Sequence, residues 1–142
     1  AIEKGNLVHL LLSKIYTQAD IPIAIQESSA QGLITKPQGR QLSKVLQSIV
    51  THPQLKRFYS NEVEAYNERE ILTESGKIII PDRLVVQKNG RTAIIDYKTG
   101  NFNPKHQEQL KNYKETVQKM GYDVVEKILV YIYPRIEIKT VQ

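Results

Sequence analysis

The chain has 142 residues, of which 40% are hydrophobic and 25% are charged, as is typical of one domain with its own core. It contains no cysteine, which excludes disulfides, thiolate zinc sites and an iron–sulfur cluster within it. No apolar run approaches a membrane span and no signal-peptide pattern opens the chain, so we expect a cytoplasmic protein with no membrane partner. The net charge of +5 mildly favours a polyanionic partner. Because the chain begins at Ala1 and enters a helix almost at once, we expect a fragment of a longer protein.

The N-terminal part of the sequence predicts three helices. Residues 2–16 carry apolar side chains at helical spacing, which we expect to form one buried stripe (Val8, Leu11, Leu12 and Ile15). A second helix is expected over residues 20–31, with Asp20 as its N-cap and Gly32 as its stop. A third is expected over residues 37–50, again from its apolar periodicity.

The rest of the sequence predicts strands and one long helix. Residues 64–73 are expected to form an outer strand. Residues 78–100 predict two central strands, because their runs are apolar on both faces. A helix with Met120 directed inward is predicted over residues 104–120. Two closing strands follow (residues 127–133 and 135–141).

These elements predict an α/β fold with a mixed central β-sheet flanked by helices and an N-terminal helical segment. No internal repeat, low-complexity tract or linker interrupts the chain. We therefore expect residues 1–142 to form a single domain, with a helical part over residues 1–58. The sheet core, with the helix over residues 104–120, is expected over residues 59–142.

The two predicted central strands carry two carboxylates and an ammonium among their apolar residues: Asp82 in the first strand, and Asp96 and Lys98 in the second. Asp96 and Lys98 share a face, because side chains two apart on a strand point the same way. A two-residue turn would place Asp82 on the opposite face, whereas a three-residue turn with a left-handed Gly90 pairs Asp82 with Asp96. We infer the three-residue turn, because only this register gathers the three charges into one site.

Such a site favours metal-dependent chemistry. Two neighbouring carboxylates repel each other unless a divalent cation lies beside them, and their oxygens favour Mg²⁺ or Mn²⁺ over zinc. A bound metal would lower the pKa of a water and neutralise developing negative charge, and Lys98 beside it would keep a positive or proton-donating group there, as hydrolysis of a phosphodiester would need. Each residue also has a simpler explanation. Asp82 could be a plain turn residue after Pro81, although the flanking β-formers favour a strand, and Asp96 with Lys98 could be an exposed ion pair. His9 could be a structural histidine, Gln109 a helix-surface residue and Tyr113 a core-edge aromatic.

Pro81-Asp82 is followed by Asp96-Tyr97-Lys98, and this pair of motifs resembles the signature of the PD-(D/E)XK nuclease superfamily. The longer Asp-Tyr-Lys-Thr-Gly run resembles the nuclease domain of RecB/AddAB-type helicase–nucleases. Gly5-x-x-x-His9 is similar to the element that opens that domain, and Gln109-Leu-x-x-Tyr113 to its helix motif. The resemblance covers nearly the whole chain and implies a restriction-endonuclease-like core.

The resemblance implies a role for each motif residue. Asp82 and Asp96 would bind a Mg²⁺ or Mn²⁺ ion, with His9 as a further ligand and the backbone carbonyl of Tyr97 completing the protein shell. Lys98 would orient or help to deprotonate the attacking water and would steady the transition state.

Outside these motifs, the resemblance implies supporting residues. Gln109 and Tyr113 would support the site or contact the DNA backbone. The family often has an acidic residue on the preceding strand, a place that Glu68 or Glu70 could take, and we favour Glu68 as a further catalytic residue. Some relatives hold an iron–sulfur cluster through cysteines, so this chain resembles the cluster-free type.

The expected function is that of an exonuclease-type, Mg/Mn-dependent deoxyribonuclease, the C-terminal part of a RecB/AddA-like helicase–nuclease in double-strand break repair. Its expected partners are DNA, as a single-stranded end or an unwound strand, and helicase domains of the parent polypeptide or of a partner subunit. Two alternatives remain open. One is a catalytically inactive nuclease-fold module that binds DNA, and the other is a stand-alone defence or restriction-type nuclease.

Overall fold

Residues 3–142 are described by a computed structural model. The chain divides into a helical unit, Ala1–Asn61, and a sheet unit, Glu62–Gln142. Ile2, where the first helix is predicted to begin, lies outside the described residues. No helix within residues 3–142 is both long and apolar enough to cross a membrane.

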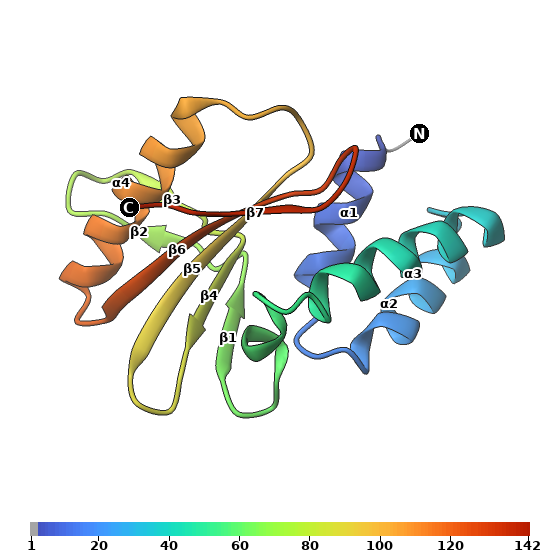
Figure 1. Cartoon of the computed structure of the whole chain (residues 1–142), viewed down its shortest axis with the longest axis horizontal. Helices are drawn as coiled ribbons and strands as arrows, with labels where there is room; N and C mark the ends of the chain where they lie inside the picture. Colours follow the sequence, from blue (N-terminus) through green and yellow to red (C-terminus); the bar gives the residue numbers. More distant parts are fainter. Residues whose placement is uncertain (1–2) are drawn as a thin grey trace. The chain divides into compact units, whose positions relative to one another are not determined.

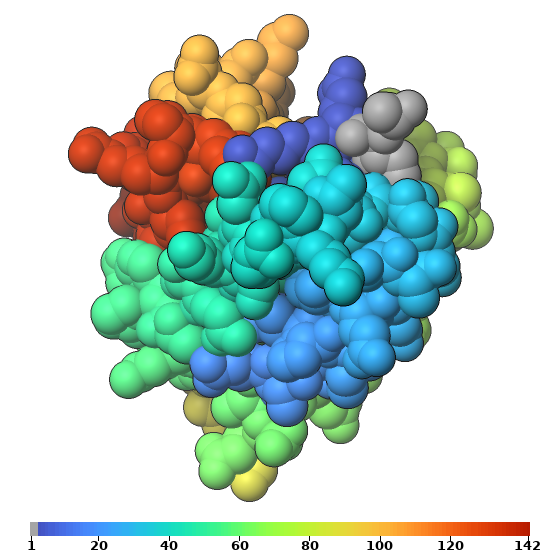
Figure 2. Space-filling model, turned by 90° about the vertical axis from the view of Figure 1, so that its right-hand side faces the viewer, coloured from blue at the N-terminus to red at the C-terminus, as the bar shows by residue number. Residues whose placement is uncertain are grey.

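The helical unit contains three α-helices and one short 3-10 helix (Figure 1): α1 (Lys4–Ser13), α2 (Asp20–Ala30), α3 (Lys36–Val50) and η1 (Lys56–Tyr59). Figure 2 shows α2, in blue, and α3, in cyan, side by side on the surface of this unit. The four residues of the predicted apolar stripe between Val8 and Ile15 are all buried, as expected, but α1 ends at Ser13, so Ile15 is buried from the turn after the helix and the predicted end at Tyr16 is wrong.

Local hydrogen bonds determine where these helices begin. α3 starts with a reciprocal capping box, in which the Gln38 N–H donates to Thr35 Oγ1 and the Thr35 N–H donates to Gln38 Oε1. The prediction that Asp20 is the N-cap of α2 is wrong, because Asp20 is the first helical residue. Its carboxylate instead accepts the N–H groups of Tyr16 and Thr17, which closes the turn before the helix.

The sheet unit confirms the predicted α/β fold with a mixed central sheet (Figure 1). Its five-stranded sheet has the order β1-β4-β5-β6-β7, in which β5 and β6 are parallel and the other neighbours antiparallel. β2 and β3 pair in a separate two-stranded sheet. The elements are β1 (Glu64–Asn67), β2 (Ile71–Leu72), β3 (Ile78–Ile79), β4 (Arg83–Val86), β5 (Arg91–Lys98), α4 (Pro104–Lys119), β6 (Asp123–Tyr131) and β7 (Glu137–Thr140).

Two of the predicted strands are each divided in two. The strand expected over residues 64–73 breaks after β1, where Glu68 takes a left-handed φ of 50°. The first central strand breaks between β3 and β4 at Pro81, which has no N–H to give to a strand ladder. The two breaks meet, because the Glu68 N–H donates to the carbonyl of Asp82 at 3.0 Å. Asp82 therefore lies in the break, one residue before β4, and not within a strand.

The helix α4 belongs to the hydrophobic core on one side of the sheet. Leu110 and Val117 of α4 are fully buried in the same cluster as Ile94 of β5. The prediction that Met120 points inward is wrong, since α4 ends at Lys119 and Met120 is 53% exposed. On the face of β5 that carries Ile94, the next residue is Asp96, so the apolar core ends where the charged residues begin.

Candidate active site

The turn between β4 and β5 determines which residues meet. The Gln87 N–H donates to the Arg91 carbonyl at 2.9 Å, and Gly90 between them has a φ of 83°. Extending the β4–β5 register one residue beyond the start of β4 places Asp82 opposite Asp96. This is the three-residue turn that the sequence predicts, and the prediction is confirmed.

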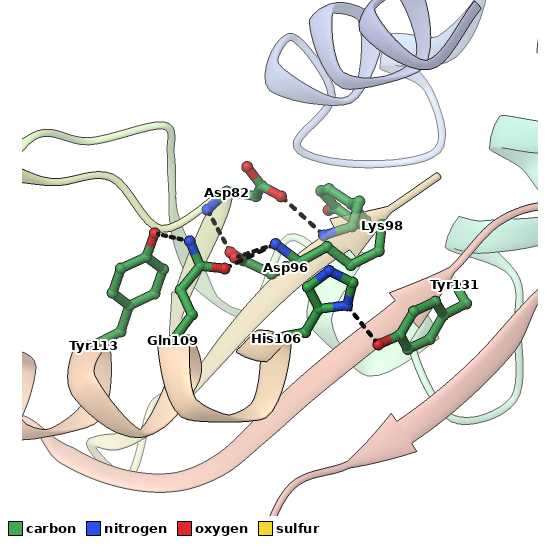
Figure 3. A network of polar contacts seen from close by, with 8 residues as sticks. Asp82, Asp96, Lys98, His106, Gln109, Tyr113 and Tyr131 are labelled. Atoms are coloured by element: carbon green, nitrogen blue, oxygen red, sulfur yellow. Dashed lines mark hydrogen bonds and ion pairs between the residues drawn. The ribbon is translucent and has the colours of Figure 1, made fainter. Parts of the chain in front are cut away.

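Asp82 and Asp96 are linked through the main chain (Figure 3). The backbone N–H of Asp82 donates to Asp96 Oδ1 at 2.9 Å. The backbone N–H of Tyr97 donates to Asp82 Oδ2 at 2.8 Å. Each carboxylate thus accepts a hydrogen bond from the backbone of the segment that carries the other, which fixes both carboxylates side by side.

Asp96 lies in a setting that disfavours its charge. The residue is only 3% exposed, and its Oδ2 lies 3.6 Å from Lys98 Nζ. Burial and then the negative charge of Asp82 raise the pKa of Asp96 to about 7, while the hydrogen bond from Asp82 and the positive Lys98 oppose the rise. A cation beside the two carboxylates would favour the charged form of Asp96 and so oppose this rise in its pKa.

Lys98 is held from the helix side by a chain of hydrogen bonds (Figure 3). Lys98 Nζ donates to Gln109 Oε1 at 2.8 Å, and Gln109 Nε2 donates to Tyr113 Oη at 3.0 Å. Gln109 and Tyr113 lie four residues apart and therefore share a face of α4. Burial, followed by the charges of Asp96 and Asp82, raises the pKa of Tyr113 to about 12, so its phenol stays neutral.

Two further residues that the sequence analysis did not single out adjoin Lys98. His106 Nδ1 lies 2.8 Å from Tyr131 Oη, and Figure 3 shows this pair beside Lys98. Burial and then the charge of Lys98 lower the pKa of His106. His106 could have been found from its position three residues before Gln109 on the same helix. Tyr131 could not, because it meets Lys98 only through the parallel pairing of β5 with β6.

Three other predicted contributions remain predictions. His9 lies on α1 of the helical unit, where its Nδ1 is 3.1 Å from the Gly5 carbonyl oxygen. Glu68 contacts Asp82 through its backbone N–H, while its side chain is exposed, as is that of Glu70. The carbonyl of Tyr97 belongs to β5, the strand that also carries Asp96, and this shared strand is the basis for the prediction that it is a metal ligand.

The donor set fits a divalent cation. Within the described part of the chain, no three His, Asp or Glu side chains form a ready-made metal cluster. Asp82 and Asp96 supply two hard oxygen ligands whose mutual repulsion a cation would relieve. Mg²⁺ is often bound by one or two carboxylates together with waters and substrate phosphates, so two protein carboxylates suffice for such an ion.

A model of the PD-(D/E)XK nuclease superfamily matches residues 1–133, which include every motif residue named above. The chain belongs to the PD-(D/E)XK nuclease superfamily. Its mixed five-stranded sheet and the four α-helices of residues 3–142 agree with the restriction-endonuclease-like core of this superfamily. PD-(D/E)XK nucleases generally use divalent metal ions, in agreement with the donor set.

Among solved structures, this PD-(D/E)XK chain is similar to the crystal structure of SSO0001, at 20% sequence identity and a TM-score of 0.40. The similarity covers 94% of this chain and 66% of that chain, so the chain spans just under two thirds of that protein's length. Among curated proteins, none matches the chain.

Proposed function

We propose that this PD-(D/E)XK domain is a Mg²⁺- or Mn²⁺-dependent deoxyribonuclease of the exonuclease type. The observation that carries the proposal is the contact between Asp82, Asp96 and Lys98. The three charges of the signature lie together at the end of an apolar core, where Asp96 is buried and Asp82 is partly buried. Charges in such a setting are costly unless they pair or hold an ion.

In this proposal, Asp82 and Asp96 hold the metal, and His9 and the Tyr97 carbonyl are further ligands. A bound divalent ion would lower the pKa of a water and offset the charge that develops on the phosphate. Glu68, next to Asp82 through its backbone, would add a further carboxylate. The hydrogen bonds from the Asp82 and Tyr97 N–H groups keep the two carboxylates in place before any ion binds.

Lys98 would act on the water and the phosphate. Its ammonium is held between Asp96 Oδ2 and Gln109 Oε1, so its position does not depend on substrate. From there it would orient the attacking water, receive or supply a proton, and place positive charge beside the phosphate. Gln109 would act by positioning Lys98, and Tyr113 by fixing the amide of Gln109.

The proposal extends to the larger protein in which this domain would act. The Asp-Tyr-Lys-Thr-Gly run and the Gln-x-x-x-Tyr helix motif support a RecB/AddA-like helicase–nuclease in double-strand break repair. Its helicase domains, in the parent polypeptide or in a partner subunit, would supply an unwound strand or a single-stranded end. A Gly-Lys-Ser/Thr phosphate-binding loop elsewhere in the full-length protein would support this context, and its absence from the protein and its partner would contradict it.

A metal-dependence assay tests the proposed activity. The chain is incubated with single-stranded and duplex DNA in Mg²⁺, in Mn²⁺ and in EDTA, and cleavage is expected only with metal. Asp96→Asn should remove the cleavage, whereas the matched control Asp123→Asn, at the exposed start of β6, should not. DNA binding by the wild-type chain without cleavage in either metal would instead support the inactive-module alternative.

A further inference from the structure

The end of the sheet beside Lys98 carries an aromatic and basic surface. Lys98 lies opposite Tyr131 in the parallel β5–β6 pair. Asp96 lies opposite Leu129, and Leu129 lies opposite Lys139 of β7, so Lys139 shares the sheet face that carries Asp96. Two strand spacings, roughly 10 Å, separate Asp96 from Lys139. We name Phe102, His106, Tyr131 and Lys139 the aromatic shelf.

Each member of the aromatic shelf contacts the next, so that the four side chains form a continuous row. The His106 and Tyr131 rings lie 5.8 Å apart, and the Tyr131 and Phe102 rings lie 6.2 Å apart at an angle of 51°. Lys139 Nζ lies 4.0 Å from the centre of the Phe102 ring. Tyr131 also interacts with the backbone of Asn103, which ties the loop after β5 to the sheet. The loop therefore presents Phe102 at a defined place.

The rings of the aromatic shelf differ in their exposure to solvent. Tyr131 is 5% exposed and supports the other rings from within the protein, whereas Phe102 is 46% exposed. A single exposed aromatic residue is common on protein surfaces. This one lies beside an ammonium group and next to the site proposed to hold a scissile phosphate. An accessible aromatic ring with a cation over it is a combination that can bind a base and its backbone in single-stranded DNA, once the cation turns to a phosphate.

We propose that the aromatic shelf is a subsite for one nucleotide of a single DNA strand, next to the nucleotide whose phosphate is cut. The backbone phosphate draws Lys139 away from the Phe102 ring, and the base stacks on the ring face that this movement frees. The His106–Tyr131 pair forms the wall between this subsite and Lys98. The base must be unpaired, because a base inside a duplex is already stacked on both faces. This inference rests on the proposed nuclease function and specifies a single strand as its substrate.

A binding measurement tests the stacking. In an Asp96→Asn background with Mg²⁺, fluorescence anisotropy is measured with a single strand, with an abasic strand of the same length and with a blunt duplex. Phe102→Ala should weaken binding of the ordinary single strand by roughly 5- to 100-fold and change the other two by less than about twofold. Phe102→Trp should retain the affinity. Met120→Ala, which truncates an exposed apolar side chain after the far end of α4, is the matched control and should change nothing.

A second variant tests the phosphate contact. Lys139→Gln should weaken binding of the ordinary and abasic strands alike and reduce the slope of log affinity against log salt by roughly 0.7–1. Lys119→Gln removes a lysine whose side chain is 66% exposed at the other end of α4, and it should leave the slope unchanged.

The proposed subsite is contradicted if folded Phe102→Ala binds the ordinary single strand as tightly as its parent does. It is also contradicted if the variant loses as much affinity for the abasic strand as for the ordinary one. Failure of the proposed nuclease function gives a different result. In that case the wild-type chain does not cut DNA in Mg²⁺ or Mn²⁺, while Phe102→Ala still weakens single-strand binding, so the binding assay supports the subsite without the activity.

Discussion

The backbone N–H of Asp82 donates to Asp96 Oδ1, so the two proposed metal ligands are linked by a hydrogen bond although their charges repel. The Tyr97 N–H makes the corresponding bond to Asp82 Oδ2. Each carboxylate therefore has two tasks, to accept a backbone N–H and to provide negative charge. Asparagine keeps the acceptor oxygen and removes the charge, whereas alanine removes both, and this difference decides which variants are informative.

Asp82→Asn and Asp96→Asn should each abolish Mg²⁺-dependent cleavage while the fold is retained, because the hydrogen-bonding oxygen remains. Asp96→Ala should be less stable than Asp96→Asn by roughly 1–3 kcal/mol, because it leaves the Asp82 N–H without its side-chain acceptor. Cleavage assays at saturating metal and urea unfolding measure the two effects. Full cleavage by either asparagine variant would contradict the assignment of both carboxylates as ligands.

The stability of the metal-free protein should depend on the ionisation of Asp96. Its pKa is about 7 in the folded chain and near 3.8 in the unfolded one, so between these values only the unfolded state gives up the proton. The contribution of Asp96 to stability is therefore fully present below pH 3.8 and is lost as the pH rises to about 7. We expect a loss of roughly 2–4 kcal/mol relative to Asp96→Asn, which has no such group.

Urea unfolding of both proteins in EDTA, at intervals across that pH range, measures this difference, because the remaining titrating groups are common to both. Added Mg²⁺ should restore stability to the wild-type protein near pH 7 and have less effect on Asp96→Asn. A difference between the two proteins that does not change with pH would show that Asp96 titrates normally.

Lys98→Ala should lower kcat by roughly 10² or more and leave metal affinity nearly unchanged, because its ammonium acts on water and phosphate. Gln109→Leu should lower kcat less, since it removes the acceptor that positions Lys98 but keeps the charge. Tyr113→Phe should have the smallest effect. Single-turnover cleavage and metal titration separate the two quantities. If metal affinity fell together with the rate in Lys98→Ala, Lys98 would instead be a structural counter-ion of the carboxylates.

Local spacing explains what could be predicted from the sequence. Asp96 and Lys98 share a face because they lie two apart on a strand, and Gln109 and Tyr113 because they lie four apart on a helix. The turn that ends at Gly90 determines the register of β4 and β5, which places Asp82 beside Asp96. This turn could be predicted because glycine takes a left-handed φ at low cost. These rules need no knowledge of distant contacts.

Non-local contacts explain what could not be predicted. Tyr131 meets Lys98 only because β6 pairs in parallel with β5 after the α4 crossover. The break at Glu68 is a left-handed residue that is not glycine, and such residues give no clear local signal. Likewise Met120 fits the helical apolar pattern, but the helix ends one residue before it, so its side chain faces solvent.

Gly90→Val should destabilise the protein by roughly 1–2 kcal/mol, because valine is strained at a φ of 83°. Apart from its own chain neighbours, no heavy atom lies within 4 Å of the position of an added Cβ, so the cost is that of the backbone alone. Gly90→Asn should cost less, since asparagine tolerates this conformation. Gly100→Ala, also in open space but without the left-handed φ, is the matched control and should be nearly neutral. If urea unfolding gave Gly90→Val the same stability as Gly100→Ala, it would contradict the left-handed conformation of residue 90 in this turn.

Glu68 offers a test in which stability and activity should change in opposite directions. Its φ of 50° strains a glutamate, so Glu68→Gly and Glu68→Asn should each stabilise the fold by up to about 1 kcal/mol. Both variants remove the carboxylate that we propose as a further catalytic group, so cleavage should fall on the order of 10²-fold.

Glu68→Asp, which keeps a carboxylate at this left-handed position, should recover part of the activity. Glu70→Ala is the matched control, because Glu70 is also exposed and lies two residues further along the same segment. If both stabilised Glu68 variants cut DNA at the wild-type rate and Glu70→Ala does not, the further catalytic carboxylate is Glu70. The left-handed turn at Glu68 then serves only to end β1 and to bring its N–H to the carbonyl of Asp82.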